Sequence, residues 1–173
     1  MSKPEISKPV EIKIEIPTNA YFMSGIRDFT LSMIRNMTDF SEQWAYRFQS
    51  VVDELCNNAI EHGSSKEDNI KVTFVAYPDQ AIEIIVEDNG TGPDQKTAKE
   101  IEETFQANKN KDMSELGIRG RGLAFIVSEW TDSITVTDKE GGGVKVTVRK
   151  NLNDSKFQAE LPSDDPTHIV LDA

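Results

Sequence analysis

The 173-residue sequence has a single cysteine, two histidines and fewer basic than acidic residues, 19 against 30. A lone cysteine, Cys56, forms no internal disulfide, which favours a reducing compartment. No stretch approaches the roughly 20 apolar residues of a membrane span, and no apolar run follows residues 1–9. The net charge of −11 disfavours direct binding of nucleic acid, because phosphate backbones need a basic surface. These absences predict a cytoplasmic protein without a membrane or nucleic-acid partner.

What is present suits one globular domain, with 37% apolar and 28% charged residues. Alternating or continuous apolar residues predict strands, whereas apolar spacings of three and four predict helices. The predicted strands are 12–16, 70–76, 82–86, 134–137 and 144–148, and the predicted helices are 21–37, 42–62, 98–105 and 122–130. This order favours an α+β fold, a two-layer sandwich of a mixed, mostly antiparallel sheet with helices on one face. We expect a loose lead over 1–10, a domain over 11–150 and an acidic tail over 151–173.

The first informative motif is ELCNNAIEHG at Glu54–Gly63, near the end of the second predicted helix. Glu54 and Asn58 are four residues apart and so leave the same side of a helix, where a carboxylate and an amide can take a proton and bind Mg²⁺. Asp53 and Asn57 form the same pair one residue earlier, and periodicity does not choose between the two pairs. Ser41 is the expected N-cap of this helix, and Gly63 is its expected end.

The second motif is EDNGTG at Glu87–Gly92, directly after the apolar strand at 82–86. Asp and Asn followed by Gly commonly form a plain turn. Alternate glycines also let a backbone approach a flat ligand, and a carboxylate at the end of a core strand can accept a hydrogen bond from an exocyclic amine. The motif alone leaves both interpretations open.

The third motif is GIRGRGLAF at Gly117–Phe125, a glycine-rich turn that opens an apolar helix. Free N–H groups at a helix start favour an anion, and four basic residues lie nearby in an otherwise acidic chain. The pattern is neither a Walker A loop nor a Rossmann fingerprint. It indicates either a polyphosphate site or a flexible loop.

In order and spacing, the three motifs resemble the N, G1 and G2 boxes of the GHKL ATPases, which include gyrase, heat-shock chaperone, histidine kinase and mismatch-repair ATPases. The resemblance runs from about Ile12 to Arg149. The compact size and the NNAIEHG ending of the first box resemble the anti-sigma-factor serine/threonine kinases of bacterial partner switching. The Bergerat fold of that superfamily is therefore the expected architecture.

The resemblance implies that Glu54 is the catalytic base, Asn58 is the Mg²⁺ ligand and Asp88 reads the adenine amine of ATP. It selects Glu54 and Asn58 over the neighbouring pair. An ATP lid is implied over about 93–119, and His62 is expected at the edge of the site or in packing. The further implied ATP contacts are Gly90, Gly92, Lys111, Arg119, Gly120, Arg121, Gly122 and Leu123.

Two positions depart from the pattern of the family. Arg121 stands between two glycines where relatives tend to carry an apolar residue, so it contacts either a phosphate or a partner. Lys145 replaces a small hydroxyl residue that some relatives use near the adenine, which puts adenine contacts at that position in doubt. The acidic tail extends beyond the usual domain and has no assigned role.

The resemblance implies a kinase that uses Mg-ATP to phosphorylate a serine or threonine of a STAS-domain antagonist. Free of that antagonist it would sequester a sigma factor or another regulator, as a homodimer. One alternative is a nucleotide-gated binding module that transfers no phosphate, and retention of Glu54 speaks against it. The other alternative is a detached histidine-kinase domain. A complete sensor kinase needs a phosphoacceptor histidine on a separate helical hairpin, which neither His62 nor His168 supplies.

Overall fold

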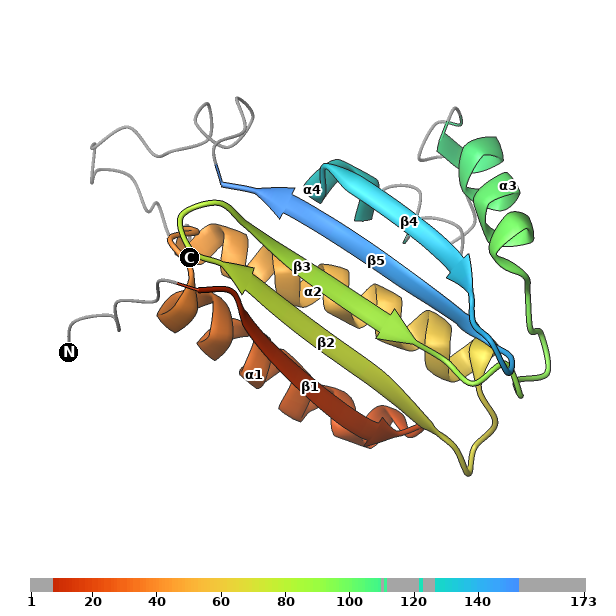
Figure 1. Ribbon diagram of the computed structural model, residues 1–173. Coiled ribbons are helices and arrows are strands. Elements are labelled where there is room, and N and C mark those ends of the chain that lie inside the picture. Colours follow the sequence, from red (N-terminus) through yellow and green to blue (C-terminus); the bar gives the residue numbers. More distant parts are fainter. Residues whose placement is uncertain (1–7, 110, 112–121, 123–126, 153–173) are drawn as a thin grey trace, which may run out of the picture.

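The computed structural model describes residues 8–109, 111, 122 and 127–152. Within this part of the chain, five strands form one sheet in the order β1-β2-β3-β5-β4 (Figure 1). The strands are β1 (Val10–Pro17), β2 (Asn69–Tyr77), β3 (Ala81–Glu87), β4 (Ser133–Asp138) and β5 (Val144–Asn151). Every pairing between them is antiparallel, so the expectation of a mixed sheet gives way to a purely antiparallel one in the described residues.

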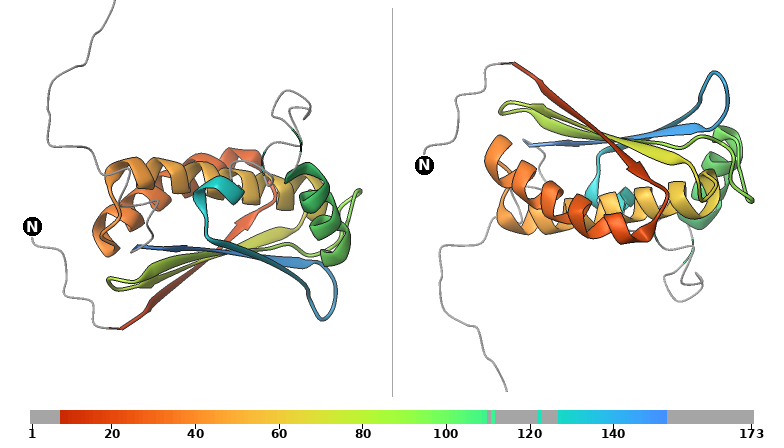
Figure 2. Two further views of the ribbon diagram at one scale, coloured as in Figure 1. Left: turned by 90° about the horizontal axis from the view of Figure 1, so that it is seen from above. Right: turned by 90° about the horizontal axis from the view of Figure 1, so that it is seen from below.

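The helices lie mainly on one face of this sheet, which makes two layers (Figure 2). They are η1 (Ala20–Phe22), α1 (Met23–Met37), α2 (Glu42–Asn58), η2 (Ala59–Gly63), α3 (Ala98–Lys109) and α4 (Ser128–Trp130). α1 and α2 run side by side beneath the sheet, whereas α3 lies beside β4 at one end of the molecule. The predicted helix over 122–130 is described only at 122 and 127–130, and its other residues lie outside the described part.

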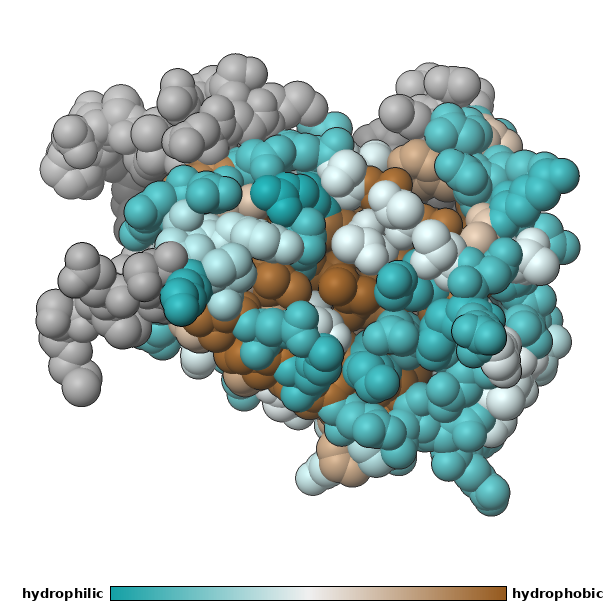
Figure 3. Space-filling view, in the orientation of Figure 1, coloured by the Kyte–Doolittle hydropathy of each residue, from teal (hydrophilic) through white to brown (hydrophobic). Residues whose placement is uncertain are grey.

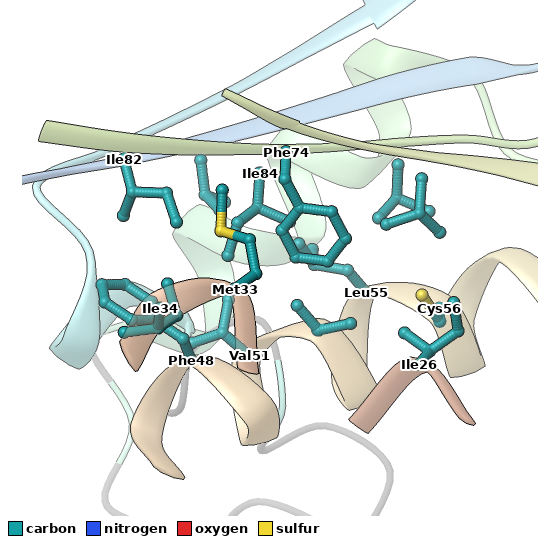
Figure 4. Packing of buried hydrophobic residues seen from close by; sticks show 14 of the residues in the cluster. Ile26, Met33, Ile34, Phe48, Val51, Leu55, Cys56, Phe74, Ile82 and Ile84 are labelled. Carbon is teal, nitrogen blue, oxygen red and sulfur yellow. The ribbon is translucent and has the colours of Figure 1, made fainter. Parts of the chain in front are cut away.

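The core fills the space between the helices and the sheet (Figure 4). One side of α2 is buried at spacings of three and four, as its sequence period predicts: Trp44, Ala45, Phe48, Val51, Val52, Leu55 and Cys56. Phe74, Ile82 and Ile84 meet this side from the strands above it. α2 begins where expected, because the Ser41 hydroxyl accepts a hydrogen bond from the Trp44 N–H at 3.4 Å. The core therefore fixes the rotation of α2 and decides which side chains face the end of the sheet.

The last turn of the second helix differs from the sequence prediction. The helix stops at Gly63 as expected, but Ala59–Gly63 form the wider π-helical turn η2 rather than continuing the α-helix. Such turns occur often at functional sites, and the wider spacing of their hydrogen bonds rotates the residues that follow. Apolar periodicity carries no signal for this change.

The other face of the sheet has no helix over it among the described residues. Ile84 and Val86 point into the core, so the alternating residues Glu83, Ile85 and Glu87 point outward. Figure 3 shows this face as polar and charged side chains around a smaller apolar area. None of the described helices has the length and apolar character of a membrane span.

Candidate functional site

A cleft opens where the end of α2, the ends of β3 and β5, and α3 come together. Its apolar wall is contributed by both layers of the fold and consists of Leu55, Ala59, Val86, Ile101, Phe105, Val144 and Val146. Its polar lining is Glu54, Asn58, His62, Asp88, Asp94, Gln95, Lys96, Thr104 and Asn108. An apolar wall with a few convergent polar groups is typical of a small-molecule site.

Glu54 and Asn58 lie together in this cleft, one helical turn apart. The Asn58 amide donates a hydrogen bond to Glu54 Oε1 at 3.2 Å. Burial raises the pKa of the Glu54 carboxyl, and the bond from Asn58 opposes that rise. A half-buried carboxylate whose pKa is moved toward neutrality is a suitable general base.

The neighbouring acid–amide pair has a different role. Asp53 accepts an ion-paired hydrogen bond from Arg27 of α1, with Nε–Oδ2 at 2.6 Å. Neither Asp53 nor Asn57 lines the cleft. Asp53 therefore ties the two helices together, and the structure separates the two pairs that periodicity could not.

Asp88 follows directly after β3 and is only 5% exposed. Its Oδ1 accepts hydrogen bonds from the N–H groups of Gly90, at 3.0 Å, and Val144, at 3.1 Å. Burial raises the pKa of this carboxyl, and the two backbone donors oppose that effect. Oδ2 takes neither bond and lies next to Gly63, which also lines the cleft. One oxygen is thus held in place by the backbone, while the other lies beside the Gly63 part of the cleft lining.

Close packing at Gly63 brings the helix end against this carboxylate. A Cβ at Gly63 would overlap the Asp88 side chain, so η2 reaches Asp88 only because position 63 has no side chain. The Gly63 carbonyl in turn accepts hydrogen bonds from the N–H groups of Thr91 and Gly92, at 3.1 and 3.4 Å. The first and second motifs are therefore joined through one residue.

Gly90 and Gly92 stand behind Asp88 and do not line the cleft. Gly90 has a φ of 66° and packs against the Gly143 backbone, whereas Gly92 packs against the carbonyl of His62. They shape the pocket by holding the turn that carries Asp88.

The third motif reaches the site through Gly122, which is buried. A Cβ at this position would overlap the Glu54 carboxylate. The glycine therefore brings its backbone to the acid of the first motif. Arg119, Gly120, Arg121 and Leu123 lie outside the described residues, and their roles stay predictions.

Part of the predicted lid closes one side of the cleft. α3 supplies Ile101, Phe105 and Asn108, and Asp94 lies 3.7 Å from His62, between Oδ2 and Nδ1. His62 is therefore at the edge of the site, as expected. Lys111 is exposed and donates to Asn108 rather than lining the cleft.

Sequence reasoning missed several polar residues that line the cleft: Asp94, Gln95 and Lys96 before α3, and Thr104 and Asn108 within it. The signal that could have found them is their position inside the predicted lid. Lys145 is exposed on the outer face of β5, while Val144 and Val146 on either side of it line the cleft. Strand alternation turns the Lys145 side chain away from the cleft, which agrees with the doubt over adenine contacts at that position.

The donor set fits Mg²⁺ better than a transition metal. Among the described residues, no three His, Cys, Asp or Glu side chains gather closely enough to form a metal site of their own. Mg²⁺ is commonly held by one or two protein oxygens, several waters and substrate phosphates. The Glu54 carboxylate beside the Asn58 amide is compatible with that mode of binding.

Comparison with known proteins identifies the family of the chain. The family model described as "Histidine kinase-, DNA gyrase B-, and HSP90-like ATPase" matches residues 45–154. The chain is 27% identical over 155 residues to serine-protein kinase RsbW of Listeria monocytogenes serotype 4a, covering 88% of this chain and 94% of that protein. It is 29% identical over 139 residues to RsbW of Bacillus mycoides, covering 79% and 83% of the two chains.

A solved structure shares the fold. A chain from the SiaB–SiaC complex of Pseudomonas aeruginosa superposes with a TM-score of 0.57 at 14% identity, covering 81% of this chain and 88% of that one. The matched family region holds Glu54, Asn58 and Asp88, which line the cleft, and Gly122, which packs against Glu54. The chain belongs to the family of histidine kinase-, DNA gyrase B- and HSP90-like ATPases.

Proposed function

We propose that this protein is a serine/threonine protein kinase that transfers the γ-phosphoryl group of Mg-ATP to a hydroxyl of a partner protein. The observation that carries the proposal is the position of Glu54. Its carboxylate is partly buried, contacts Asn58 and Gly122, and lines the same cleft as Asp88. Relatives named serine-protein kinase RsbW, which match 88% of the chain, support the same reaction.

In this proposal adenine occupies the end of the cleft beside Asp88. Oδ2 of Asp88 accepts a hydrogen bond from the exocyclic amine, while Val86, Val144 and Val146 contact the base. The triphosphate then extends toward Glu54. Gly122 and the predicted contacts from Gly120, Arg119, Arg121 and Leu123 belong to the phosphate end, and Lys96 adds a positive charge to the lining of the cleft.

The incoming serine or threonine hydroxyl gives its proton to the Glu54 carboxylate as its oxygen forms a bond to the γ-phosphorus. The bond between the γ-phosphorus and the bridging oxygen breaks, and ADP leaves. Because phosphoryl transfer depends mainly on positioning and charge stabilisation, the fixed geometry of Glu54 and Asn58 is central. Mg²⁺, held by Asn58 and phosphate oxygens, would supply charge neutralisation at the phosphates.

The proposed phosphoacceptor is a STAS-domain antagonist, and the second partner is a sigma factor or another regulator that the kinase holds when the antagonist is phosphorylated. A cytoplasmic homodimer completes this proposal. The support is the similarity to RsbW kinases together with a fold shared with a protein solved in the SiaB–SiaC complex.

The test measures phosphate transfer from labelled ATP to a STAS-domain protein from the same genome. Glu54→Gln is expected to lower the transfer rate by about 10²–10⁴-fold, because a general base contributes about that much, and to leave ADP binding intact. Asp53→Asn is the matched control, since it changes the adjacent acid outside the cleft and is expected to keep transfer. If the wild type binds Mg-ATP and its partner yet transfers no phosphate, it is a nucleotide-gated binding module and not a kinase.

A pull-down analysed by mass spectrometry, with and without ATP, identifies which regulator the protein holds. A sigma factor that is retained in the presence of ATP and released by the unphosphorylated antagonist supports partner switching. Retention that is unaffected by the antagonist contradicts it.

A further inference from the structure

The turn between β4 and β5 lies directly against Asp88. Lys139 begins this turn, with its N–H bonded to the Gly143 carbonyl at 2.9 Å and its carbonyl bonded to the Gly142 N–H at 3.1 Å. Gly143 has a φ of 85°, and a Cβ there would overlap the Asp88 carbonyl. The turn is therefore built to pack closely on the residue that carries the proposed adenine contact.

The side chain of Lys139 reaches from this turn to the backbone of Asp88. Its ammonium donates a hydrogen bond to the Asp88 carbonyl oxygen at 2.7 Å and lies 3.7 Å from Glu87 Oε1. The Lys139 side chain is 26% exposed, while Asp88 is almost fully buried. A buried carbonyl needs a partner, and a charged donor makes a stronger one than a neutral group.

Each polar group of Asp88 except Oδ2 is thus engaged by this part of the fold. The Asp88 N–H donates to the Val144 carbonyl at 3.1 Å, and Oδ1 accepts from Gly90 and Val144. The carbonyl accepts from Lys139. The peptide that begins with this carbonyl carries the Asn89 N–H, and the next peptide carries the Gly90 N–H that donates to Oδ1. Rotation of that peptide would therefore disturb the carboxylate itself.

We infer that Lys139 is a positioning residue for adenine recognition: it fixes the Asp88 backbone so that Oδ2 presents a single, correctly aimed acceptor to the base. The inference rests on the proposed ATP site. Without the ammonium, the Asp88 carbonyl loses the charged donor that fixes its direction, so the peptide can rotate and move the Gly90 donor with it. Lys139 therefore acts through Asp88 and does not touch the nucleotide.

The positive charge of Lys139 also favours Asp88 as a hydrogen-bond acceptor for the base. Burial raises the pKa of the Asp88 carboxyl, whereas the two backbone donors and the Lys139 ammonium lower it. The ammonium thus helps to keep the carboxylate ionised and able to accept from an amine. A base with a carbonyl in place of the amine would instead face a carboxylate that repels it.

The test compares binding of ADP with binding of inosine diphosphate, which carries an oxygen where adenine carries the amine. Titration calorimetry is performed on the wild type, Lys139→Met, Lys139→Arg and Lys71→Met. Lys71 is exposed on the outer face and pairs with Glu87 in the sheet register, so its variant removes a charge near the same glutamate. Thermal unfolding without nucleotide checks that each variant is folded.

Lys139→Met is expected to weaken ADP binding about tenfold and to change inosine diphosphate binding less than about twofold, so base selectivity falls. Lys139→Arg is expected to recover most of the selectivity, and Lys71→Met to match the wild type. Equal losses for both nucleotides, or unchanged selectivity in Lys139→Met, would overturn the inference while leaving the ATP site intact. A wild type that does not prefer ADP would instead refute the proposed adenine site, and the role of Lys139 with it.

Discussion

Glu54 combines a cost in stability with a role in the proposed reaction. Its carboxyl is partly buried, and burial is the largest cause of its raised pKa. A raised pKa in the folded state means that ionisation costs the folded protein free energy relative to the unfolded chain. The residue that is most suited to accept a proton is therefore held in a setting that opposes its charge.

This opposition predicts a pH-dependent gain in stability for Glu54→Gln. The free-energy cost of ionising Glu54 is absent below the pKa of this residue in the unfolded chain. It grows as pH rises from that pKa toward the higher pKa of the folded protein, and it is fully present above the folded pKa. The free energy of unfolding of Glu54→Gln, minus that of the wild type, is expected to increase from acidic to neutral pH. Denaturant titrations at several pH values measure this difference.

Glu67→Gln is the control, because Glu67 is exposed in the turn before β2, lies outside the cleft and is not one of the charges that act on Glu54. It is expected to follow the wild type across the same pH range. A constant difference between Glu54→Gln and the wild type at all pH values would contradict the prediction. The same raised pKa bears on the rate of the proposed transfer. As pH is lowered, this rate is expected to fall at a pH above the ordinary pKa of a glutamate, because the base is inactive when protonated.

At the scale of elements, two glycines in helical segments are expected to respond oppositely to alanine. An added Cβ at Gly25 in α1 meets nothing within 4 Å, so Gly25→Ala is expected to stabilise the protein by about 0.5–1 kcal/mol. An added Cβ at Gly63 overlaps Asp88, whose carboxylate is held by two backbone donors. Gly63→Ala is expected to destabilise by about 1–3 kcal/mol, as in overpacked cores.

Chemical denaturation measures both changes, and calorimetry measures ADP affinity in each variant. Gly25→Ala is expected to bind ADP as the wild type does, whereas Gly63→Ala is expected to bind it more weakly. Equal stability of the two variants would show that η2 shifts to accommodate a side chain at position 63. The contact between η2 and Asp88 would then not require glycine.

The elements also show which parts of the structure can be predicted from the sequence and which cannot. All five strands, α1, the start of α2 and the start of α3 follow from apolar period and capping, because each depends on residues close in sequence. The π-helical turn at Ala59–Gly63 depends on packing against Asp88, 25 residues beyond Gly63, and could not be predicted this way. Lys139 was missed for the same reason, since its position follows from the path of the β4–β5 turn.

At the scale of the whole molecule, the cleft is assembled from both layers and from distant parts of the chain. Glu54 and Asn58 come from α2, Asp88 follows β3, and Val144 and Val146 come from β5, which pairs with β3. The acid–amide pair is presented by the same helix whose other side fills the core. A ligand that contacts all these elements therefore binds only the folded chain.

Binding restricted to the folded chain predicts a rise in melting temperature with nucleotide. At a free concentration of about 100 times the dissociation constant, Mg-ADP is expected to add ~2.7 kcal/mol of stability. For a chain of this length that corresponds to roughly 5–10 °C, measured by differential scanning calorimetry. Asp88→Asn is the matched comparison: its amide keeps an acceptor oxygen but removes the charge, so a much smaller rise is expected. An equal rise in both proteins would mean that the nucleotide stabilises the fold without using the carboxylate between β3 and β5.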